Sequence, residues 1–327
     1  MMQNKISVIG LGKLGLCYAA CFSSAGFKVI GIDLNKEAVD AVNRKQPHIF
    51  EPDLNELLQE NPIEATTDFA RAKETDVTFF IVPTPSMADG NFDNKYLKSA
   101  FESILPHVKD KYHIFSIVST VTPSSLENEI LPIIKRITGK DTGNFGLCYN
   151  PSFIALGDVI RNIFYPDMIL IGESDTKAGN ILEEIHKKVY KNNAPIMRTN
   201  IINAEIAKIA LNAYITMKIN FGNLIGEICE KVKGGNADEV ARIIGTDTRI
   251  GRKYLSAGTA YGGPCFPRDA IAFDSFAKKH GVDAKNVRAT HEMNEYQAKR
   301  IAELAIKELG NLQGKTIAIL GVSYKPK

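Results

Sequence analysis

Residues 6–33 read ISVIGLGKLGLCYAACFSSAGFKVIGID, and their pattern predicts the fold of the N-terminal half of the chain. It starts and finishes with a short apolar run, and between the two runs three glycines in GxGxxG spacing lead into a helical pattern. In order, these parts are residues 6–9, then Gly10, Gly12 and Gly15, then residues 16–25 and residues 29–32. A strand, a glycine turn, a helix and a second strand in this order predict the first unit of a Rossmann-type, doubly wound sheet.

The glycine turn has the features of a dinucleotide site. Gly10 permits a tight turn, Gly12 lets a pyrophosphate approach the backbone, and Gly15 lets the helix pack on the strand, while the helix N-terminus adds partial positive charge. Asp33 ends the second strand, where a carboxylate suits ribose hydroxyls and repels a 2′-phosphate. The pattern therefore favours NAD, although Lys36 nearby leaves NADP open. The cofactor contacts expected here come from Gly10, Leu11, Gly12, Lys13, Leu14, Gly15, Asp33 and Lys36.

Composition narrows the class of protein. The chain has 327 residues, of which 44% are hydrophobic, which is enough for two domains or slightly more. A formal net charge of +3 predicts no nucleic-acid partner. No signal peptide is visible, and no apolar stretch reaches the roughly 20 residues of a membrane helix. The five cysteines have no CxxC spacing, which argues against disulfides and a metal site and favours a cytoplasmic protein.

The pattern of apolar residues changes near residue 200. Before that point, short apolar runs alternate with helical patterns such as residues 97–108 and 126–137, which predicts an α/β domain over residues 1–198 with a parallel sheet covered on both faces. The runs are residues 6–9, 29–32, 77–82, 114–118, 146–149 and 168–171.

The remainder is predicted to be mostly helical. A helical spacing without proline runs from residue 202 to about 233, so we expect one long central helix inside an all-α middle domain over residues 199–310. Such a helix needs its faces covered, and it offers a homodimer interface. Residues 314–321 look like the first strand of a third α/β domain, over 311–327, that is cut short.

Other polar side chains follow the predicted strands. Ligands of open α/β sheets bind beyond the carboxyl ends of strands, so these residues would contact the nicotinamide half of the cofactor. The alternative is that proline and threonine simply end the strands. The first two groups are Pro83, Thr84 and Pro85, and Ser119 and Thr120; a third group follows residue 149, with Asn150, Pro151 and Ser152.

Cys265 lies in an unusual stretch, GGPCFPRD at residues 262–269. Glycines and prolines predict a rigid loop around the thiol, and Arg268 would favour a nucleophilic thiolate. The other four cysteines occupy apolar stretches and are expected to be small buried hydrophobes. Lys208 and Asn212 share one face of the long helix, where an ammonium and an amide would stabilise an oxyanion; the alternative is a solvated, surface-exposed pair.

Together these residues resemble the UDP-glucose/GDP-mannose dehydrogenase family over essentially the whole chain. The matching motifs, in order, are the GxGxxG; residues 82–85; residues 119–121; Asn150 and Pro151; residues 205–208 with Asn212 and Ala213; residues 249–251; residues 262–269; and Tyr324, Lys325 and Pro326.

The resemblance implies a four-electron oxidation of the C6 alcohol of a nucleotide sugar to a carboxylate with two NAD⁺. Cys265 would attack the aldehyde to give a thiohemiacetal, and further oxidation would give a thioester. Lys208 and Asn212 would stabilise oxyanions. Asp269 would orient Lys208 and a water molecule that Thr120 helps to hold, and Arg268 would contact the cofactor.

The resemblance also implies a set of substrate contacts. Arg249 resembles an arginine that reaches the substrate across a dimer interface, and its context favours UDP-sugars over GDP-mannose. The expected sugar-binding residues are Ser152, Phe153, Lys208, Asn212, Arg249, Tyr254, Leu255, Ser256, Ala257, Gly258 and Gly262.

Two departures from the family pattern keep alternatives open. Ser152 replaces the usual glutamate after Asn-Pro, and Leu156 stands at the second acidic position of that motif. A serine cannot act as a general base near neutral pH, and losing a general base costs roughly 10²–10⁴-fold in rate. The resemblance also implies a C-terminal domain that grips the nucleotide, and residues 311–327 are expected to be only its start. The alternatives are a catalytically impaired NAD-binding homologue, or a two-electron β-hydroxyacid-type dehydrogenase, which has no use for the cysteine loop.

Overall fold

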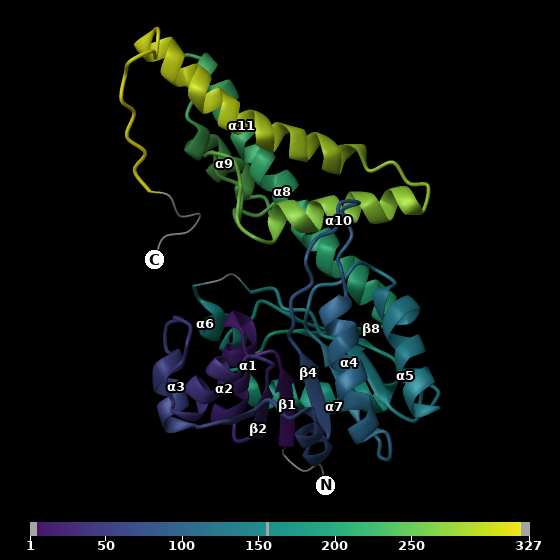
Figure 1. The fold of residues 1–327 in the computed structure, drawn as a ribbon. Coiled ribbons are helices and arrows are strands. Elements are labelled where there is room, and N and C mark those ends of the chain that lie inside the picture. Colours follow the sequence, from purple (N-terminus) through teal and green to yellow (C-terminus); the bar gives the residue numbers. More distant parts are fainter. Residues whose placement is uncertain (1–4, 155–156, 322–327) are drawn as a thin grey trace. The chain divides into compact units, whose positions relative to one another are not determined.

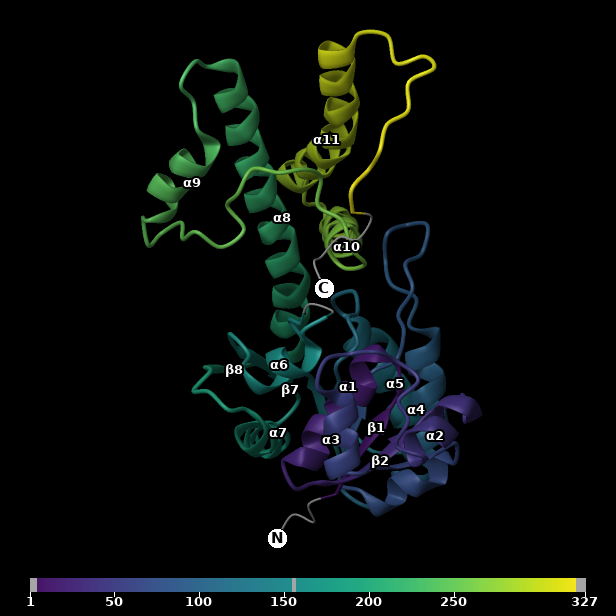
Figure 2. The same ribbon diagram turned by 90° about the vertical axis from the view of Figure 1, so that its left-hand side faces the viewer.

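The computed structural model describes residues 5–154 and 157–321, and the chain divides into two compact units. The first unit comprises Met1–Met87 and Phe92–Lys208, and the second comprises Ala88–Asn91 and Ile209–Lys327. Figures 1 and 2 draw them from two directions.

The first unit is built on one sheet, whose strand order is β3-β2-β1-β4-β5-β6-β7-β8 across the described residues. From β1 the chain first adds β2 and β3 on one side and then adds β4 to β8 on the other side. This is the doubly wound arrangement that the sequence predicts. The strands are β1 (Lys5–Ile9), β2 (Lys28–Ile32), β3 (Glu64–Thr66), β4 (Val77–Phe80), β5 (Ile114–Ile117), β6 (Gly146–Tyr149), β7 (Ile169–Glu173) and β8 (Ile196–Thr199).

Strand pairing is parallel throughout the described sheet except between β6 and β7, which are antiparallel. In the centre, Ile6 of β1 lies opposite Val29 of β2 on one side and Val77 of β4 on the other. The sheet is therefore mixed rather than wholly parallel as expected. The antiparallel β7 leads through a helix into β8, which then runs parallel to it.

Helices cover both faces of this sheet, as predicted (Figures 1 and 2). Phe79 belongs to one buried cluster with α1 and α7, while its neighbour Phe80 belongs to a second cluster with α4, because successive strand side chains point to opposite faces. The helical segments are α1 (Lys13–Ser24), α2 (Lys36–Asn43), α3 (Leu54–Glu60), η1 (Phe69–Glu74), α4 (Lys95–Val108), η2 (Leu126–Ile130), α5 (Leu131–Thr138), α6 (Val159–Phe164) and α7 (Thr176–Val189).

Two strands, β3 and β8, were not predicted from the sequence. β3 reads EAT and β8 reads IMRT, and both are too short and too polar to form an apolar run. Backbone pairing, with β2 and with β7 respectively, defines them, and pairing is a tertiary property that side-chain patterning does not report.

The second unit is helical, as predicted for the middle of the chain. The long helix α8 (Ile201–Lys231) passes from the first unit into the second. The other helices of the second unit are α9 (Ala237–Gly245), α10 (Phe266–Lys279) and α11 (Lys285–Leu309). α11 is joined to α8 by a hydrogen bond from Asn220 to the carbonyl of Thr290 and by ion pairs from Arg300 to Glu227 and Glu230.

The strand expected at residues 314–321 does not form in the described part of the chain, where residues 311–321 have no regular structure. A strand needs a hydrogen-bonding neighbour, and none is paired with this segment among the described residues. The motif residues Tyr324, Lys325 and Pro326 lie outside the described residues.

Candidate active site

The glycine turn of the first unit forms a cradle at the start of α1. Gly10 has a φ of +93°, and a Cβ there would lie 2.3 Å from the carbonyl oxygen of Ile81. A Cβ on Gly15 would lie 1.8 Å from the carbonyl oxygen of Gly10, whereas a Cβ on Gly12 would meet open space. Gly12 is the N-cap of α1, and no side chain caps the helix. The first-turn amides, which have no intrahelical partner, therefore suit a pyrophosphate.

Asp33 is held close to this turn. Its Oδ2 accepts a hydrogen bond from the amide of Leu11 at 2.6 Å, and its Oδ1 accepts one from the amide of Asn35 at 2.8 Å. Each carboxylate oxygen has a further lone pair for a ribose hydroxyl. Lys36 is exposed as the first residue of α2. The turn and Asp33 lie together as predicted, and they fit an adenine dinucleotide.

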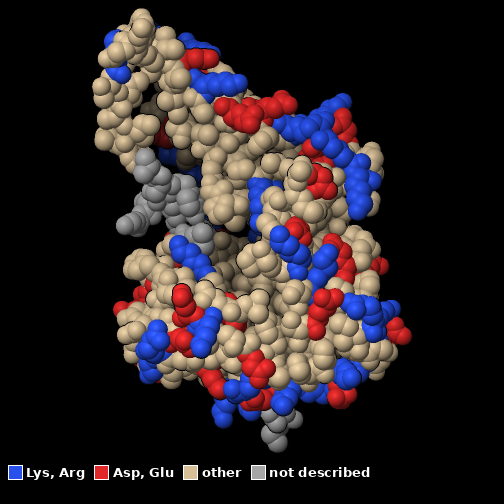
Figure 3. All heavy atoms as spheres, viewed as in Figure 1, with Lys and Arg blue, Asp and Glu red and all other residues tan. Residues whose placement is uncertain are grey.

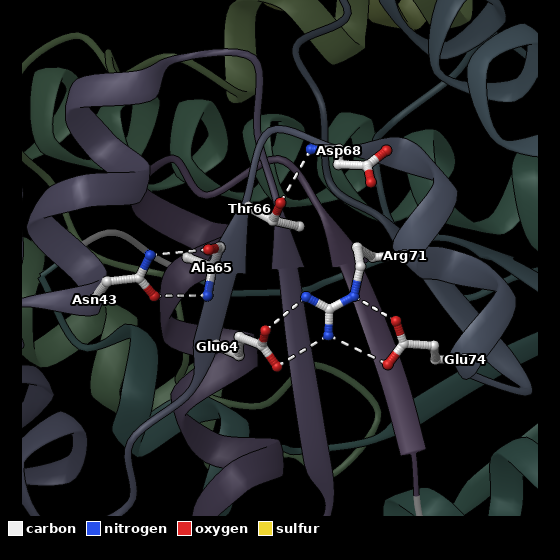
Figure 4. Close-up of polar contacts among 7 residues, drawn as sticks. All are labelled: Asn43, Glu64, Ala65, Thr66, Asp68, Arg71 and Glu74. Atoms are coloured by element: carbon white, nitrogen blue, oxygen red, sulfur yellow. Dashed lines mark hydrogen bonds and ion pairs between the residues drawn. The ribbon is translucent and has the colours of Figure 1, made fainter.

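The outer edge of this half-site is braced by polar contacts around β3 (Figure 4). The side-chain amide of Asn43 bonds to both backbone groups of Ala65 at 2.9 Å, as a neighbouring strand would. The guanidinium of Arg71 lies between the carboxylates of Glu64 and Glu74. Thr66 accepts a backbone hydrogen bond from Asp33 at 3.1 Å, so β3 helps to place the carboxylate. This support has no signal in the sequence, because the three residues of β3 form no apolar run.

The loops after β4 and β5 are tied together. Ser119 Oγ accepts a hydrogen bond from the amide of Val82 at 2.9 Å and donates to the carbonyl of the same residue at 2.7 Å. Thr84 Oγ1 donates to the carbonyl of Thr120 at 2.6 Å. Threonine and serine here do more than end strands, because their hydroxyls join two of the predicted loops. Pro83 is exposed and Pro85 half-buried beside them.

A buried polar chain holds the loop after β6. Asn150 donates from Nδ2 to the carbonyl of Leu170 at 2.8 Å, and its Oδ1 lies 2.6 Å from Nε2 of His186. Burial lowers the pKa of His186 to about 3, so the ring is neutral at neutral pH. An amide oxygen can only accept, so Nε2 carries the proton, and Nδ1 accepts from the hydroxyl of Tyr190 at 2.8 Å. Nothing in the sequence pattern singled out His186.

Lys208 points at this same loop. Its Nζ donates to the carbonyl oxygen of Ser152 at 2.8 Å and lies 5.0 Å from the centre of the Phe153 ring. Lys208 is only 5% exposed, so the alternative of a solvated lysine is wrong. The Ser152 hydroxyl accepts a local hydrogen bond from the amide of Ile154 at 3.3 Å. Leu156 lies outside the described residues.

In the second unit, Asn212 meets Asp269. The amide of Asn212 donates from Nδ2 to Oδ2 of Asp269 at 2.6 Å, and both residues are buried. Arg268 Nε lies 3.6 Å from the other carboxylate oxygen, Oδ1. The alternative of a surface asparagine is therefore wrong as well, because Asn212 supports a buried carboxylate.

Cys265 is exposed and is the N-cap of α10. The expected rigid loop ends here, because residues 266–269 form the first turn of α10 rather than a loop. Pro267 is tolerated in a first turn, where its missing amide hydrogen has no intrahelical partner. Cys17, Cys21 and Cys148 are buried as predicted. Cys229 is only half-buried, so that part of the prediction is wrong; its place on α8 leaves one side of the residue uncovered.

The predicted sugar-binding segment lies against α8 within the second unit. Asn223 accepts a hydrogen bond from the amide of Gly258 at 2.8 Å and donates to the carbonyl of Thr259 at 3.0 Å. Leu255 is buried, and Tyr254 adopts a φ of +63° that an L-residue rarely takes. The helix therefore fixes the backbone of this segment. Asn223 was not predicted, although its place on the long helix was. Ser256, Gly258 and Gly262 are exposed, and Ala257 is half-buried.

Arg249 lies near this segment in the sequence and extends into solvent, with 87% of its side chain exposed. Its guanidinium pairs with Asp247, from Nε to Oδ1 at 3.0 Å and from NH2 to Oδ2 at 2.7 Å. A screened pair of this kind is weak, so the arginine is available for another anion.

Surface charge is mixed. On the face in Figure 3, lysine and arginine side chains alternate with aspartate and glutamate, and no single-sign field covers it. Among the described residues, no cluster of histidine, cysteine, aspartate and glutamate could hold a metal ion. No helix in the described part is long and apolar enough to span a bilayer.

Comparison with known families finds two matches. Residues 4–190 match the UDP-glucose/GDP-mannose dehydrogenase family, NAD binding domain, and residues 202–296 match the central domain of the same family.

Known proteins are similar over nearly the whole chain. UDP-glucose 6-dehydrogenase AglM of Haloferax volcanii is 35% identical over 330 residues, covering 98% of this chain and 76% of the relative. GDP-mannose 6-dehydrogenase of Pseudomonas syringae pv. syringae is 32% identical over 331 residues, covering 98% and 74%. The solved UDP-glucose dehydrogenase of Pyrobaculum islandicum has a TM-score of 0.87 and 32% identity, covering 96% of this chain and 73% of that one.

Proposed function

The chain belongs to the UDP-glucose/GDP-mannose dehydrogenase family, and from that premise we propose that it oxidises the C6 alcohol of a UDP-sugar to the uronic acid. Membership confirms the resemblance and the prediction of NAD. The relatives are nucleotide-sugar 6-dehydrogenases, which favours this reaction over a two-electron hydroxyacid-type oxidation.

The residues of the first unit fit the cofactor. The amides at the start of α1 would bind the pyrophosphate, and Asp33 would bind the adenosine ribose. NAD⁺ supplies a hydride acceptor, and two molecules are needed, because one alcohol and one water become one carboxylic acid with release of two NADH and two protons.

The observation that carries the proposal is the position of Cys265. The thiol is exposed at the N-terminus of α10, a 14-residue helix whose dipole stabilises an anion at that end. A thiolate there would add to the C6 aldehyde to form a thiohemiacetal, whose alkoxide is a better hydride donor than the aldehyde. Loss of that hydride leaves a thioester, which water cleaves to the acid and the free thiol.

Lys208 and Asn212 are the proposed oxyanion donors. Each is buried and held in one orientation by a hydrogen bond, Lys208 by the carbonyl of Ser152 and Asn212 by Asp269. Preorganised donors of this kind stabilise developing negative charge without reorganising. Asp269 and Thr120 take the roles that the resemblance implies, in orienting the water that cleaves the thioester.

Ser152 makes this last step slow in the proposed mechanism. The position that usually supplies a carboxylate carries a hydroxyl, and that hydroxyl already accepts a local amide. Without a general base, hydrolysis falls by roughly 10²–10⁴-fold. The acyl-enzyme would therefore accumulate on Cys265. The same observation supports a second candidate function, a catalytically impaired NAD-binding homologue.

The remaining proposed contacts lie in the second unit. The segment from Tyr254 to Gly258, together with Gly262, would bind the sugar, and Arg249 would reach across a dimer interface to the substrate of a second copy of the chain.

That second copy would cover an apolar stripe on α8. Tyr214, Phe221, Leu224 and Ile228 recur at helical spacing and are 65%, 54%, 37% and 53% exposed, and Val232 continues the row. One helix face that is apolar along several turns can pair with its own copy about a twofold axis. We therefore propose a homodimer through α8.

The deciding experiment mixes the protein with NAD⁺ and a panel of UDP- and GDP-sugars and counts the NADH formed per sugar. Two NADH per UDP-sugar support the proposal. One NADH indicates that the aldehyde is released, and no NADH with any sugar supports the impaired homologue. Measuring NAD⁺ binding by calorimetry in parallel separates failure of the chemistry from failure to bind the cofactor.

A further inference from the structure

Glu205 is a buried carboxylate near the start of α8. It is 1% exposed, and both of its oxygens accept backbone amides from a segment about eighty residues earlier in the chain. Oε2 accepts from Ser124 at 2.7 Å, and Oε1 accepts from Leu126 at 3.1 Å.

These amides belong to the N-terminus of the helical stretch formed by η2 and α5. The residue at its N-cap, Ser125, makes no capping hydrogen bond with its own side chain. Ser124 just before it has a φ of +72°, a conformation that a non-glycine residue keeps only when its surroundings hold it. Glu205 therefore performs, from another helix, the capping that the local sequence does not.

The capped segment is the end of the loop that carries Thr120. The loop is fixed at its other points by Thr84, which bonds the Thr120 carbonyl, and by Thr122, whose hydroxyl accepts from the amide of Phe92 at 3.0 Å. Glu205 supplies the only one of these ties that comes from α8.

The next turn of the same helix carries Lys208. Residues three apart on a helix lie on the same side, and Lys208 reaches the loop after β6 while Glu205 reaches the loop after β5. β5 and β6 are neighbouring parallel strands. The first turns of α8 are thus joined to two adjacent strand ends through two charged side chains.

Burying the Glu205 carboxylate carries a desolvation cost. Burial, with a smaller contribution from the charge of Glu127, raises the pKa of Glu205 to about 7, although the two amides act in the opposite direction. A neutral side chain would cap a helix without this desolvation cost. Two acceptor oxygens on one side chain are what the two amides require.

We infer that Glu205 is a positioning residue, which holds the Thr120 loop in register with the turn of α8 that carries Lys208. The expected effect of Glu205 on turnover rests on the proposed function, whereas its effect on the order of the Thr120 loop does not. Neither Ser124 nor Glu205 would contact the reacting atoms; Glu205 acts through Thr120 and Lys208.

The test compares wild-type protein with Glu205→Gln, which has the same shape but only one acceptor oxygen. Hydrogen exchange of peptides covering residues 119–127 is expected to be about tenfold faster in the variant, because one buried amide loses its acceptor. With a sugar substrate, kcat is expected to fall about tenfold or more while KM for NAD⁺ changes less than twofold, since small displacements of positioned groups lower rate more than cofactor binding.

Asp175→Asn is the matched control. Asp175 caps α7 in the same unit by accepting the amide of Ala178 at 2.9 Å. It also accepts a hydrogen bond from Tyr112, which lies just before the start of β5, whereas the Thr120 loop follows the end of that strand. Asparagine caps helices about as well as aspartate, so this variant should leave both exchange at 119–127 and kcat unchanged. Glu205→Asp keeps both oxygens on a shorter side chain, should recover part of the lost rate, and carries the test if Glu205→Gln does not fold.

Unchanged exchange at 119–127 in Glu205→Gln overturns the inference. So does a kcat equal to that of the Asp175→Asn control. If wild-type protein forms no NADH with any sugar, the proposed function fails, and the exchange measurement alone still decides whether Glu205 holds the loop.

Discussion

Asn212 of α8 donates a 2.6 Å hydrogen bond to Asp269 of α10, and both side chains are buried in the second unit. Asp269 lies one helical turn after Cys265 and donates its own backbone amide to the Cys265 carbonyl at 2.8 Å. The hydrogen bond thus connects the central helix to the turn that presents the thiol. Two residues 57 apart in the sequence form one unit of the proposed site.

Replacing the acceptor should break this connection. Asp269→Asn places an amide opposite the Asn212 amide and removes the charge beside Arg268, so the free energy of unfolding should fall by about 1–3 kcal/mol. Denaturant unfolding measures this, and NADH formation should fall with it. Asp283→Asn, at an exposed ion pair, is the control and should change stability little. Equal unfolding midpoints for the two variants would contradict the prediction.

Removing the nucleophile should separate the two oxidations. Cys265→Ala is expected to lower acid formation roughly a thousandfold or more and to give at most one NADH per sugar, because no thiohemiacetal can form. Coupled absorbance and product chromatography measure both quantities. Cys229→Ala removes a half-buried thiol without a proposed role and should keep two NADH per sugar. Acid formation by Cys265→Ala at the wild-type rate would exclude the covalent mechanism.

Restoring a carboxylate at residue 152 should accelerate turnover. Ser152→Glu is expected to raise the steady-state rate by about tenfold or more, since it supplies the missing general base. Intact-protein mass spectrometry should show a sugar adduct on wild-type Cys265 during turnover and less of it in the variant. Ser152→Gln adds similar bulk without a base and should not accelerate. Fast wild-type turnover with no adduct would show that hydrolysis is not impaired.

Glu205 should make stability depend on pH. Its pKa is raised from 4.5 to about 7 in the folded protein, so the folded state binds the proton more tightly than the unfolded chain. Burial favours the protonated carboxyl in the folded protein, so this shift in pKa adds to the free energy of unfolding at low pH. The added stability is full below about pH 4.5 and is lost as the pH rises through 7, by roughly 3 kcal/mol in all. Between pH 5 and pH 8, the free energy of unfolding should therefore decrease more for the wild type than for Glu205→Gln, because glutamine does not titrate. Parallel pH curves for the two proteins would refute this assignment.

The α8 stripe should hold two copies together. Phe221→Glu combined with Ile228→Glu places charges on the centre of the exposed apolar row, and it should convert a dimer to a monomer in sedimentation experiments. Ile306→Glu changes an equally exposed apolar residue on α11 and should leave the association unchanged. A wild-type protein that sediments as a monomer at all concentrations would rule out the homodimer.

Much of the first unit was predictable because its signals are local. Spacing alone predicts the dinucleotide turn, through Gly10, Gly12, Gly15 and Asp33, and the apolar runs predict the central strands. Strand β3 was not predictable, since three residues with one buried alanine carry no periodic pattern. The long helix was found from its spacing, but the function of Glu205 on it was not.

Local sequence signals were enough to predict the doubly wound sheet, the helical second unit, the dinucleotide turn and the candidate residues Lys208, Asn212 and Cys265. Backbone steric limits and helical or strand spacing are properties of neighbouring residues, so a local stretch of sequence reports them. Three contacts could be seen only in the folded chain: Lys208 binds the Ser152 carbonyl, Asn212 supports Asp269, and Glu205 caps a distant loop. Those contacts join residues 56 to 81 positions apart, and burial leaves each polar group only the partner that folding brings to it.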